Sequence, residues 1–474
     1  MKIALVLAFA CLLAGVQARA EHAVTVTVEP QGNAPAAAIP DDFVGLSFGM
    51  RNVIPDKAGG HFFSATNAPL ITIFRNLGLR HLRVGGTSVE WPPHTAIPNE
   101  ADIDSLFAFA RAAGLNKVIY SFRLLETNSA QHFETTNAAL ARYIGDHYGP
   151  QLDCFAVGNE PDRGKIYGHD VAITNFDTYL AKWRRFVAAI TNAVPDARFT
   201  GPDAGSGNIA WTRRFAAVEK GSGLVTMICE HFYVGGAGRG KSAQEGIEAM
   251  LSPAWIEANQ KLYDRMAVPV LTNGLPYRFT EANDHYSGGI PDASDTFAGA
   301  LWALDFLHWW AAHEARGVDF HNTQWVPNDV ITPDGNGGLR INPKGYGLRA
   351  FELGGHGSVQ PCKLENPDGL NLTAYAVRGP TGLFVTLINK EHGAAGREAA
   401  VKLTAPGDAK SAVVVFLKAA SGEAAARTGI TLGGSPITAD GPWRGSWTPL
   451  GTNSAGNLLI TLPATSAAVV RIEH

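Results

Sequence analysis

The spacing of apolar residues divides the chain into two stretches with different periods. From Asp42 to about Leu353, short β-rich runs alternate with longer segments in which apolar residues recur every three or four positions, as they do on one face of a helix. After about Gly354, apolar and polar residues alternate in short runs separated by Gly, Pro, Asn and Asp, which is typical of antiparallel strands. The pattern therefore predicts an α/β unit followed by an all-β unit.

The first stretch contains eight β-rich runs. They cover residues 43–48, 81–85, 117–122, 152–158, 198–202, 224–233, 268–280 and 318–325. Eight strands that alternate with helices over about 310 residues favour a (β/α)8 TIM barrel. A doubly wound sheet usually has a glycine-rich phosphate turn after its first strand, and Gly85-Gly86 is no such turn.

The second stretch is predicted to form an antiparallel β-sandwich. Its alternating runs cover residues 370–377, 383–389, 412–418, 458–462 and 467–472, with no helix-length segment between them. Near the N-terminus, Val24, Val26 and Val28 alternate with threonines before the barrel begins. We therefore expect this N-terminal strand to join the C-terminal sandwich.

The first twenty residues have the features of a secretory signal peptide. Lys2 precedes an apolar run over residues 3–16, and the small-residue triplet Ala18-Arg19-Ala20 follows. The run is shorter than the ~20 residues of a membrane span, so a membrane anchor is the weaker alternative. The sequence thus predicts a secreted or periplasmic protein without a membrane span, divided into residues 1–20 (signal peptide), 21–40 (N-terminal strand), 41–353 (barrel) and 354–474 (sandwich).

Composition and charge narrow the class of protein further. The chain has 474 residues, of which 46% are hydrophobic and 17% charged, and loss of Lys2 and Arg19 takes its net charge from -4 to -6. This balance excludes a disordered chain and a strongly basic nucleic-acid binder. The cleaved chain would keep Cys154, Cys229 and Cys362, so at most one internal disulfide could form and the fold must depend on its core.

Two glutamates follow barrel strands in positions suited to chemistry. Asn159-Glu160-Pro161 comes after the fourth run, and Thr280-Glu281 closes the seventh. Barrel active sites lie at the carboxyl ends of the strands, and Pro161 blocks continuation of the strand ladder. Two opposed carboxylates are what glycoside hydrolysis requires. The alternative is that each glutamate is a solvated rim residue.

These motifs resemble those of a known group of enzymes. Asn159-Glu160-Pro161 and Thr280-Glu281 are similar to the acid/base and nucleophile signatures of the retaining glycoside hydrolases of clan A. Within that clan, the segments 82–87 (LRVGGT), 231–233 (HFY) and 281–289 (EANDHYSGG) resemble glycoside hydrolase family 79. That family contains exo-acting β-glucuronidases and heparanase, and it pairs a (β/α)8 barrel with a β-sandwich. The resemblance implies that Glu160 is the acid/base and Glu281 the nucleophile, with no metal or cofactor.

The resemblance also implies a set of substrate-binding residues. Asn159 would hold the sugar 2-hydroxyl, and Tyr233 would orient Glu281, unless it is a core tyrosine. Tyr286 and Gly288 match a loop in which the family recognises the C6 carboxylate, although a flexible glycine turn is the alternative. Glu90 occupies a place where the family often has an acidic residue that binds sugar hydroxyls.

The chain departs from the family after the eighth run. The glucuronidases usually have a glycine-rich segment there that ends in a tyrosine, whereas this chain has His321-Asn322-Thr323-Gln324-Trp325. Asn322 and Gln324 could read a hydroxyl or a carboxylate, and Trp325 is either a stacking platform for a sugar or a core residue. The first run ends in residues 46–50 (LSFGM), without the acidic residue that the family often has there. Both departures concern the pocket that would recognise the sugar.

The resulting hypothesis is a retaining, exo-acting hydrolase that releases β-linked glucuronic acid from glycans or glucuronides. An endo-acting heparanase-like enzyme would need clustered Lys and Arg along its cleft, and a neutral-sugar β-glycosidase of clan A is a further alternative. A catalytically inactive carbohydrate-binding protein is disfavoured because both glutamates are present. A metalloenzyme is disfavoured because the chain has no HExxH and no paired Cys/His spacing. We expect a carbohydrate substrate and no nucleic-acid partner, and the sequence does not determine the oligomeric state.

Overall fold

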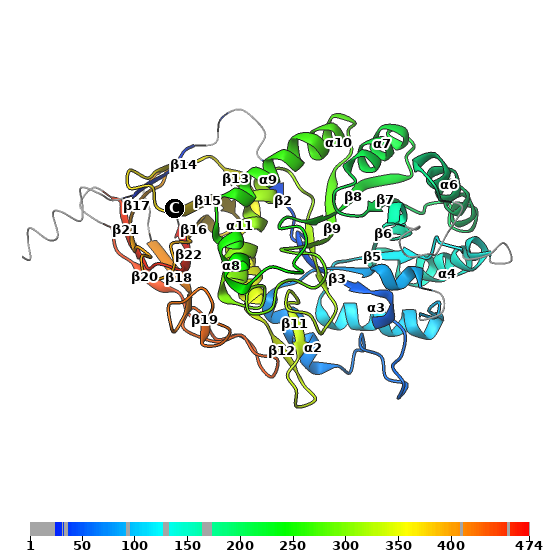
Figure 1. Cartoon of the computed structure of the whole chain (residues 1–474), viewed down its shortest axis with the longest axis horizontal. Helices are drawn as coiled ribbons and strands as arrows, with labels where there is room; N and C mark the ends of the chain where they lie inside the picture. The colour runs from blue at the N-terminus through cyan, green and yellow to red at the C-terminus, as the bar shows by residue number, and fades with distance from the viewer. Residues whose placement is uncertain are drawn as a thin grey trace, which may run out of the picture.

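The computed structural model describes residues 24–473, apart from residues 31, 33–36, 92–94, 127–131, 164–172, 408–410 and 453–455. The signal peptide predicted over residues 1–20 lies outside the described residues. Two units lie beside each other, a barrel on the right of Figure 1 and a sandwich on the left. Among the described residues, no helix combines the length and the apolar character needed to cross a membrane.

Eight parallel strands close into a barrel in the order β10-β3-β4-β5-β6-β7-β8-β9. Their bounds are β3 Val44–Gly49, β4 His81–Gly85, β5 Lys117–Phe122, β6 Leu152–Val157, β7 Phe199–Ala204, β8 Val225–Tyr233, β9 Tyr277–Asn283 and β10 Val318–Asn322. Each of the eight predicted runs overlaps one of these strands. The predicted (β/α)8 barrel is therefore confirmed.

The run at residues 268–280 was predicted to be one strand, and its first half is a helix instead. Residues Val268–Thr272 form α10, which continues from α9 (Ala254–Leu262) through the π-helical turn η5 (Tyr263–Ala267). Pro269, which has no N–H to donate, is the second residue of α10 and comes directly after the π-helical turn. A helix that is already nucleated extends easily, so the preceding helix overrides the β-branched residues of this segment.

Helices surround the barrel on its outer side. The main ones are α2 Ala68–Leu77, α3 Glu100–Ala113, α4 Phe133–Tyr148, α6 Phe176–Ala193, α7 Ile209–Glu219, α8 Ala243–Leu251, α11 Phe297–Ala312 and α12 Pro343–Gly354. Most are amphipathic, but almost every residue of α11 is buried. The cause is its position between the barrel and the sandwich (Figure 1), where Asp305 accepts hydrogen bonds from Tyr375 and Lys390 of the second unit.

The second unit consists of two mostly antiparallel sheets. One has the order β14-β1-β17-β21, and the other β19-β18-β22-β16-β15-β13-β2 with β20 on β18. Their bounds are β1 Val24–Val28, β2 Ala38–Ile39, β13 Gly357–Gln360, β14 Cys362–Glu365, β15 Leu372–Gly379, β16 Gly382–Asn389, β17 Ala399–Thr404, β18 Ser411–Ala419, β19 Ile430–Leu432, β20 Thr448–Leu450, β21 Leu458–Leu462 and β22 Ser466–Glu473. The predicted sandwich is confirmed.

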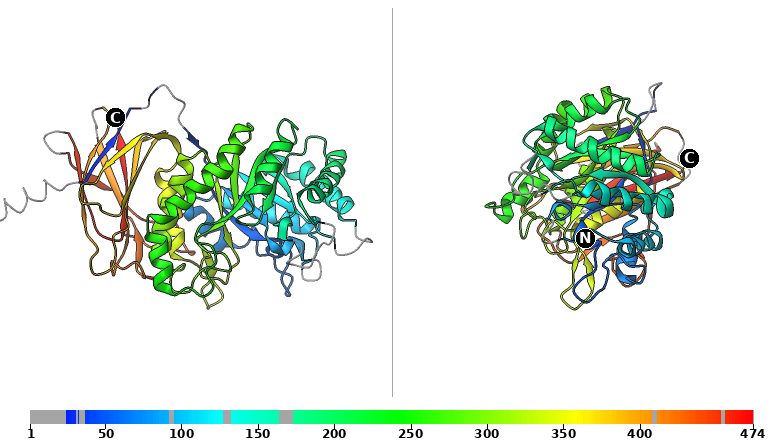
Figure 2. Two further views of the ribbon diagram at one scale, coloured as in Figure 1. Left: turned by 45° about the horizontal axis from the view of Figure 1, so that its top comes forward. Right: turned by 90° about the vertical axis from the view of Figure 1, so that its right-hand side faces the viewer.

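The N-terminal strand β1 belongs to this sandwich, as its alternation predicts. It pairs antiparallel with β14 and parallel with β17, and Figure 2 shows this blue strand among the strands of the C-terminal unit. Val24, Val26 and Val28 are buried in the sandwich core. The chain therefore enters the molecule through the sandwich before it builds the barrel.

A layer of charged residues closes the amino-terminal end of the barrel. Arg278 of β9 donates to both carboxylate oxygens of Asp319 on β10, at 2.9 Å each. His81 of β4 contacts the same carboxylate through Nδ1 at 2.7 Å. A Cβ on Gly45 would lie 2.0 Å from Asp319 Oδ1, so a glycine makes room for this cluster. The other end of the barrel remains open to substrate.

Candidate active site

The two predicted catalytic glutamates meet at the carboxyl-terminal mouth of the barrel. Glu160 follows β6, and Glu281 lies in β9. One carboxylate oxygen of each glutamate and one ring nitrogen of His231 lie within 4.8 Å of one another. The glutamates are only 7% and 6% exposed, which makes their charges sensitive to every neighbouring group.

The backbone turns sharply to place Glu160. Gly158 has a φ of 97° and Glu160 itself a φ of 44°, a left-handed conformation that few non-glycine residues adopt. The amide of Glu160 donates to the carbonyl of Asp203, at 2.8 Å. The strand therefore ends in a turn that directs the Glu160 side chain over the mouth.

Glu281 is held as an ionised carboxylate. The Tyr233 hydroxyl donates to its Oε1 at 2.8 Å, Arg83 Nη1 donates to its Oε2 at 3.1 Å, and His321 Nδ1 lies 3.6 Å from Oε2. Burial alone would raise the pKa of Glu281, but the basic side chains around it and the tyrosine bond lower that pKa to about 2. Glu281 is thus the charged member of the pair.

Arg83 donates hydrogen bonds to three residues of the site. It is fully buried, and besides Glu281 it donates to Asn159 Oδ1 at 2.7 Å and to Asp203 Oδ2 at 3.1 Å. Burial would raise the pKa of Asp203, but Arg83 and His231 hold it well below its usual range. The guanidinium therefore holds the side chains of Asn159 and Glu281 in fixed positions relative to each other.

His231 lies between the carboxylates. Its Nδ1 is 3.2 Å from Glu160 Oε1, and its Nε2 is 3.6 Å from Asp203 Oδ1. Burial would lower the pKa of His231, but the surrounding carboxylates raise it to about 10. Glu160, His231 and Glu281 are the described residues grouped closely enough to hold a metal ion.

An open pocket of about 270 Å³ leads to the two glutamates, close to the lower end of the usual size of a ligand pocket. On the side of β6 and β7 it is lined by Glu160, Arg163 and Ser206. On the side of β9 and β10 it is lined by Tyr286, Ser287, Gly288, His321, Thr323, Val326 and Asn328, with Thr87, Tyr233 and Glu281 completing the wall.

Several predicted substrate-binding residues lie at this pocket. Tyr233 contacts Glu281. The exposed ring of Tyr286 packs edge-on against the ring of Tyr233, with 6.3 Å between the ring centroids. Gly288 has a φ of 89°, and a Cβ there would lie 2.9 Å from Val326. Asn159 lies deeper, since it is 2% exposed. The site therefore brings Tyr233, Tyr286, Gly288 and Asn159 together around the glutamates.

Glu90 does not line the pocket, in contrast to the predicted contact with sugar hydroxyls. It is 1% exposed, and its carboxylate accepts backbone N–H groups from Leu124, Leu125 and Asn159 at 2.9 to 3.3 Å. Burial raises its pKa to about 7 despite these bonds. In this position Glu90 supports the loop that carries Asn159. The sequence motif did not reveal that both carboxylate oxygens of Glu90 accept hydrogen bonds from backbone amides.

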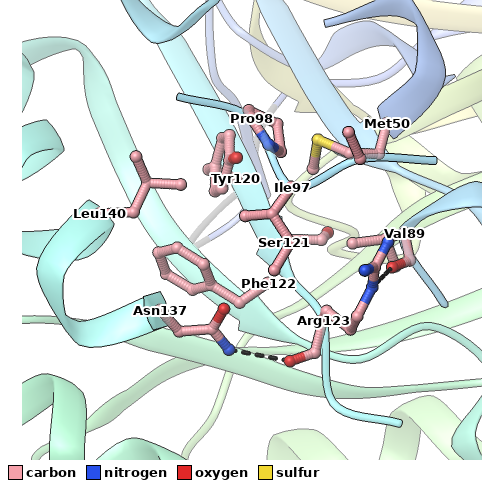
Figure 3. A pocket seen from close by; sticks show the side chains of 11 residues that line it. Met50, Val89, Ile97, Pro98, Tyr120, Ser121, Phe122, Arg123, Asn137 and Leu140 are labelled. Atoms are coloured by element: carbon pink, nitrogen blue, oxygen red, sulfur yellow. Dashed lines mark hydrogen bonds between the residues drawn. The ribbon is translucent and has the colours of Figure 1, made fainter. Parts of the chain in front are cut away.

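A separate small cavity lies beside the end of β5 (Figure 3). Arg123 lines it and donates from Nε to the Val89 carbonyl at 2.6 Å, while its own carbonyl accepts from Asn137 at 2.8 Å. The cavity has a volume of about 10 Å³ and mostly apolar walls. It has room for about one water molecule and is no substrate site.

The segment after β10 differs from expectation in its details. Trp325 is 58% exposed, and the Arg51 guanidinium lies 4.5 Å from its ring centroid, so Trp325 is no core residue. Asn322 is buried, and its Oδ1 accepts from the amides of Val330 and Ile331. Asn322 therefore holds the following loop and does not read the sugar, whereas His321 and Thr323 line the pocket.

Sequence reasoning assigned no role to Arg83, Asp203, His231, His321 or Arg163. The first four share a signal, namely a charged or titratable residue within or directly beside an apolar barrel strand, and charged side chains are rarely buried unless they are paired. Arg163 gave no such signal because it follows the fourth strand in an irregular segment.

Comparisons with known proteins agree with this architecture. The model of "Glycosyl hydrolase family 79, N-terminal domain" matches residues 103–308. A β-glucuronidase from Aspergillus niger is 26% identical over 235 residues, which are 44% of this chain and 42% of that protein. The chain thus aligns with less than half the length of this curated relative.

Solved structures show the same fold at low identity. A 4-O-α-L-rhamnosyl-β-D-glucuronidase from Fusarium oxysporum has a TM-score of 0.69 at 19% identity, covering 94% of this chain and all of that one. A family 51 arabinofuranosidase from Xanthomonas axonopodis has a TM-score of 0.67 at 13% identity, covering 95% of this chain and all of that one. The family match, the β-glucuronidase relative and the shared fold together show that the chain is similar to the glycoside hydrolases of family 79.

Proposed function

We propose that the chain is a retaining, exo-acting glycoside hydrolase that releases β-linked glucuronic acid, with Glu160 as acid/base and Glu281 as nucleophile. The observation that carries this proposal is the approach of the two carboxylates, which have oxygens within 4.8 Å of each other at the ends of β6 and β9. Retaining enzymes hold their carboxyl groups about 5 to 5.5 Å apart, whereas inverting enzymes need about 6.5 to 9.5 Å for a water molecule.

In the first step, protonated Glu160 gives its proton to the glycosidic oxygen while Glu281 attacks the anomeric carbon. The bond to the leaving group breaks, and an ester forms between Glu281 and the sugar. The low pKa of Glu281 keeps this nucleophile ionised at any working pH. Arg83 and Tyr233 orient it, and neither has to move during the attack.

In the second step, ionised Glu160 takes a proton from a water molecule, which attacks the same carbon and releases the sugar with its configuration retained. Formation of the ester removes the negative charge of Glu281 from beside His231 and Glu160. The same carboxyl group can therefore act first as acid and then as base.

The pocket wall on the side of β9 and β10 supports recognition of an acidic sugar. It is lined by Tyr286, Ser287, Gly288 and His321. Hydroxyl and backbone N–H donors bind carboxylates well when a loop fixes them. The Aspergillus niger relative is a β-glucuronidase, which supports the same choice of sugar.

Two loops close this end of the pocket, which supports exo action. Asn328 donates to the carbonyl of His285 at 2.7 Å, and Gly288 packs against Val326. These contacts join the loop after β9 to the loop after β10, and the two loops form one wall of the pocket. A chain that continued beyond the released sugar would need an open cleft here.

The test is hydrolysis of 4-nitrophenyl β-glycosides of glucuronic acid, glucose, galactose and xylose, with the released anomer followed by proton NMR. We expect the highest kcat/KM for the glucuronide and the β-anomer as the first product. A preference for a neutral sugar would overturn the uronate proposal, and a first product in the α form would overturn retention. Internal cleavage of a heparan chain into long fragments would favour the heparanase-like alternative.

A further inference from the structure

Arg163 is the arginine of the pocket wall, and it lies at the end that holds Glu160. It belongs to the short 3-10 helix η4 (Pro161–Arg163), its side chain is 30% exposed, and its Nε lies 3.5 Å from Glu160 Oε2. Its Nη2 donates to the carbonyl of Ser206 at 3.3 Å. The guanidinium is thus part of the pocket surface and is in contact with the proposed acid/base.

Neighbouring residues fix the position of this guanidinium. Asp162 accepts from the amide of Gly205 at 2.8 Å and from Asn208 Nδ2 at 3.0 Å, which ties η4 to the loop after β7. A Cβ on Gly205 would lie 2.1 Å from Arg163 Nε. The arginine therefore lies directly against the backbone of this loop, in a place that only glycine leaves open.

The position of Arg163 in the pocket distinguishes it from the groups that face the released sugar. Tyr286, Gly288 and Asn328 form the wall beside β9 and β10, whereas Arg163 and Ser206 come from the ends of β6 and β7. Glu160 must contact the oxygen of the leaving group in order to protonate it. A side chain that touches Glu160 from outside that wall faces the leaving group.

The positive charge of Arg163 also favours a particular kind of leaving group. When Glu160 is protonated for the first step, one negative charge disappears from beside Arg163. A negative group on the leaving portion of the substrate would replace it. We propose that Arg163 forms a subsite for a single anionic group next to the cleaved bond; this inference rests on the proposed function and specifies its substrate class.

The chemistry of the subsite defines its ligand. A guanidinium binds planar or tetrahedral oxyanions through paired N–H groups, so the ligand is a carboxylate or a sulfate on the leaving sugar or aglycone. One arginine in the wall serves one such group and not a polyanion.

The experiment compares three aryl β-glucuronides of similar shape, with 3-carbamoylphenyl, 3-carboxyphenyl and 3-sulfophenyl leaving groups. We expect wild-type kcat/KM to be about tenfold higher for at least one anionic compound than for the neutral one, the gain of a charge-assisted contact. The carboxylate and sulfonate arms show which oxyanion the subsite takes. In Arg163→Gln the ratio of anionic to neutral kcat/KM should fall to about one.

The ratio of anionic to neutral kcat/KM distinguishes binding of the leaving group from effects on Glu160, because altered proton transfer slows hydrolysis of neutral and anionic compounds alike. Gly205→Ala should reproduce the loss, since its Cβ would displace the guanidinium, and Arg163→Lys should retain part of the preference. The matched control is Arg214→Gln, which removes a surface arginine that is 53% exposed and pairs with Asp177, and it should leave the ratio unchanged.

Two results would overturn this inference while leaving the proposed function intact. One is a wild-type enzyme that hydrolyses all three glucuronides with the same kcat/KM. The other is an Arg163→Gln variant that keeps the anionic preference but loses the preference for glucuronide over glucoside, since Arg163 would then read the released sugar. Absence of activity on every glucuronide would instead overturn the proposed function.

Discussion

At the scale of single residues, Glu160 and Glu281 belong to one cluster and meet different partners. Glu281 receives hydrogen bonds from Tyr233 and Arg83, whereas Glu160 lies beside His231 and Arg163. Two carboxyl groups with different neighbours can hold different protonation states at one pH. The two roles should therefore be separable by mutation.

We expect Glu281→Ala to lower kcat on 4-nitrophenyl β-glucuronide by a factor on the order of 10⁴. Glu160→Ala should lower kcat/KM by about 10² to 10⁴ for a poor leaving group and by less for 4-nitrophenol, which leaves without a proton. Added azide should give the β-azide with Glu160→Ala and the α-azide with Glu281→Ala, because each alanine opens a different face of the sugar.

The exposed helix residue Glu257 offers the matched control, and Glu257→Ala should keep wild-type kinetics. Truncation at the mouth creates no core cavity, so all three variants should fold. Glu281→Ala should unfold at a lower temperature than the other two, because it removes an ionised carboxylate paired with the buried Arg83. Near wild-type turnover in either glutamate variant would refute the assigned roles.

Motifs could predict the two glutamates and Tyr233 but not the charges that tune them. Arg83 and His231 appear within strand-like runs, and only the closed barrel shows that both contact Glu281 or its neighbours. Glu90 is the opposite case, since its motif suggested a sugar contact and the fold uses its carboxylate for backbone amides. Which partner satisfies a buried charge depends on tertiary contacts that no local spacing encodes.

At the scale of elements, one buried lysine links the two loops that line the pocket on the side of β9 and β10. Lys344, at the start of α12, donates to the side chains of Asn283 and Asp284 and to the carbonyl of Asn328. Burial would raise the pKa of Asp284, but Lys344 holds it well below its usual range. The end of β9, the loop after β10 and α12 therefore move as one unit.

Replacing this lysine should loosen that unit. We expect Lys344→Met to destabilise the fold by about 3 to 5 kcal/mol, because Asp284 keeps a buried charge without its counter-ion, and denaturant unfolding would measure this. If the variant folds at low temperature, KM for the glucuronide should rise more than kcat falls. Lys363→Met removes an exposed lysine paired with Glu365 and should change neither quantity. Equal stabilities of the two variants would contradict the linking role.

Element types were predictable where one period continues over a whole segment, as in α6 and in strands β4 and β5. The segment Val268–Thr272 was not, because its β-branched residues favour a strand and its helix depends on the preceding α9 and η5. The loop after β10 was not predictable either, since Asn322 and Lys344 organise it through contacts between distant residues.

At the scale of the whole molecule, three buried groups with raised pKa values make stability fall as pH rises above about pH 5. Burial raises the pKa of Glu90 to about 7 and that of Glu230 to about 8, while carboxylates raise that of His231 to about 10 against the opposing effect of burial. A raised pKa means that the folded state holds a proton which the unfolded state releases. The contribution of each group to the stability of the fold therefore falls as pH rises from its pKa in the unfolded state to its pKa in the folded state.

The lowered groups act in the opposite direction. Asp203, Asp284 and Glu281 have depressed pKa values, so their contribution is complete above the unfolded values and is lost as pH falls below them. We therefore expect the thermal unfolding midpoint to be highest near about pH 5 and to fall towards both pH 3 and pH 9.

A series of thermal unfolding scans from pH 3 to pH 10 measures this dependence, and Glu230→Gln provides a specific check. Glu230 is buried against Thr212, outside the glutamate pair. An uncharged amide there should reduce the fall in midpoint between pH 4.5 and 8 and leave the acid side unchanged. A wild-type midpoint that rises steadily from pH 5 to pH 9 would contradict the assigned shifts.

The position of β1 has a consequence for the order in which a ribosome could deliver this fold. β1 lies between β14 and β17, so its two neighbours are residues 362–365 and 399–404. During synthesis Val24–Val28 must stay unpaired until the entire barrel has left the exit tunnel, and the barrel strands can pair in sequence meanwhile. Barrel first and sandwich last is therefore the order that the topology imposes, and a nascent chain stalled before residue 399 would expose Val24, Val26 and Val28 as an apolar strand open to chaperone binding.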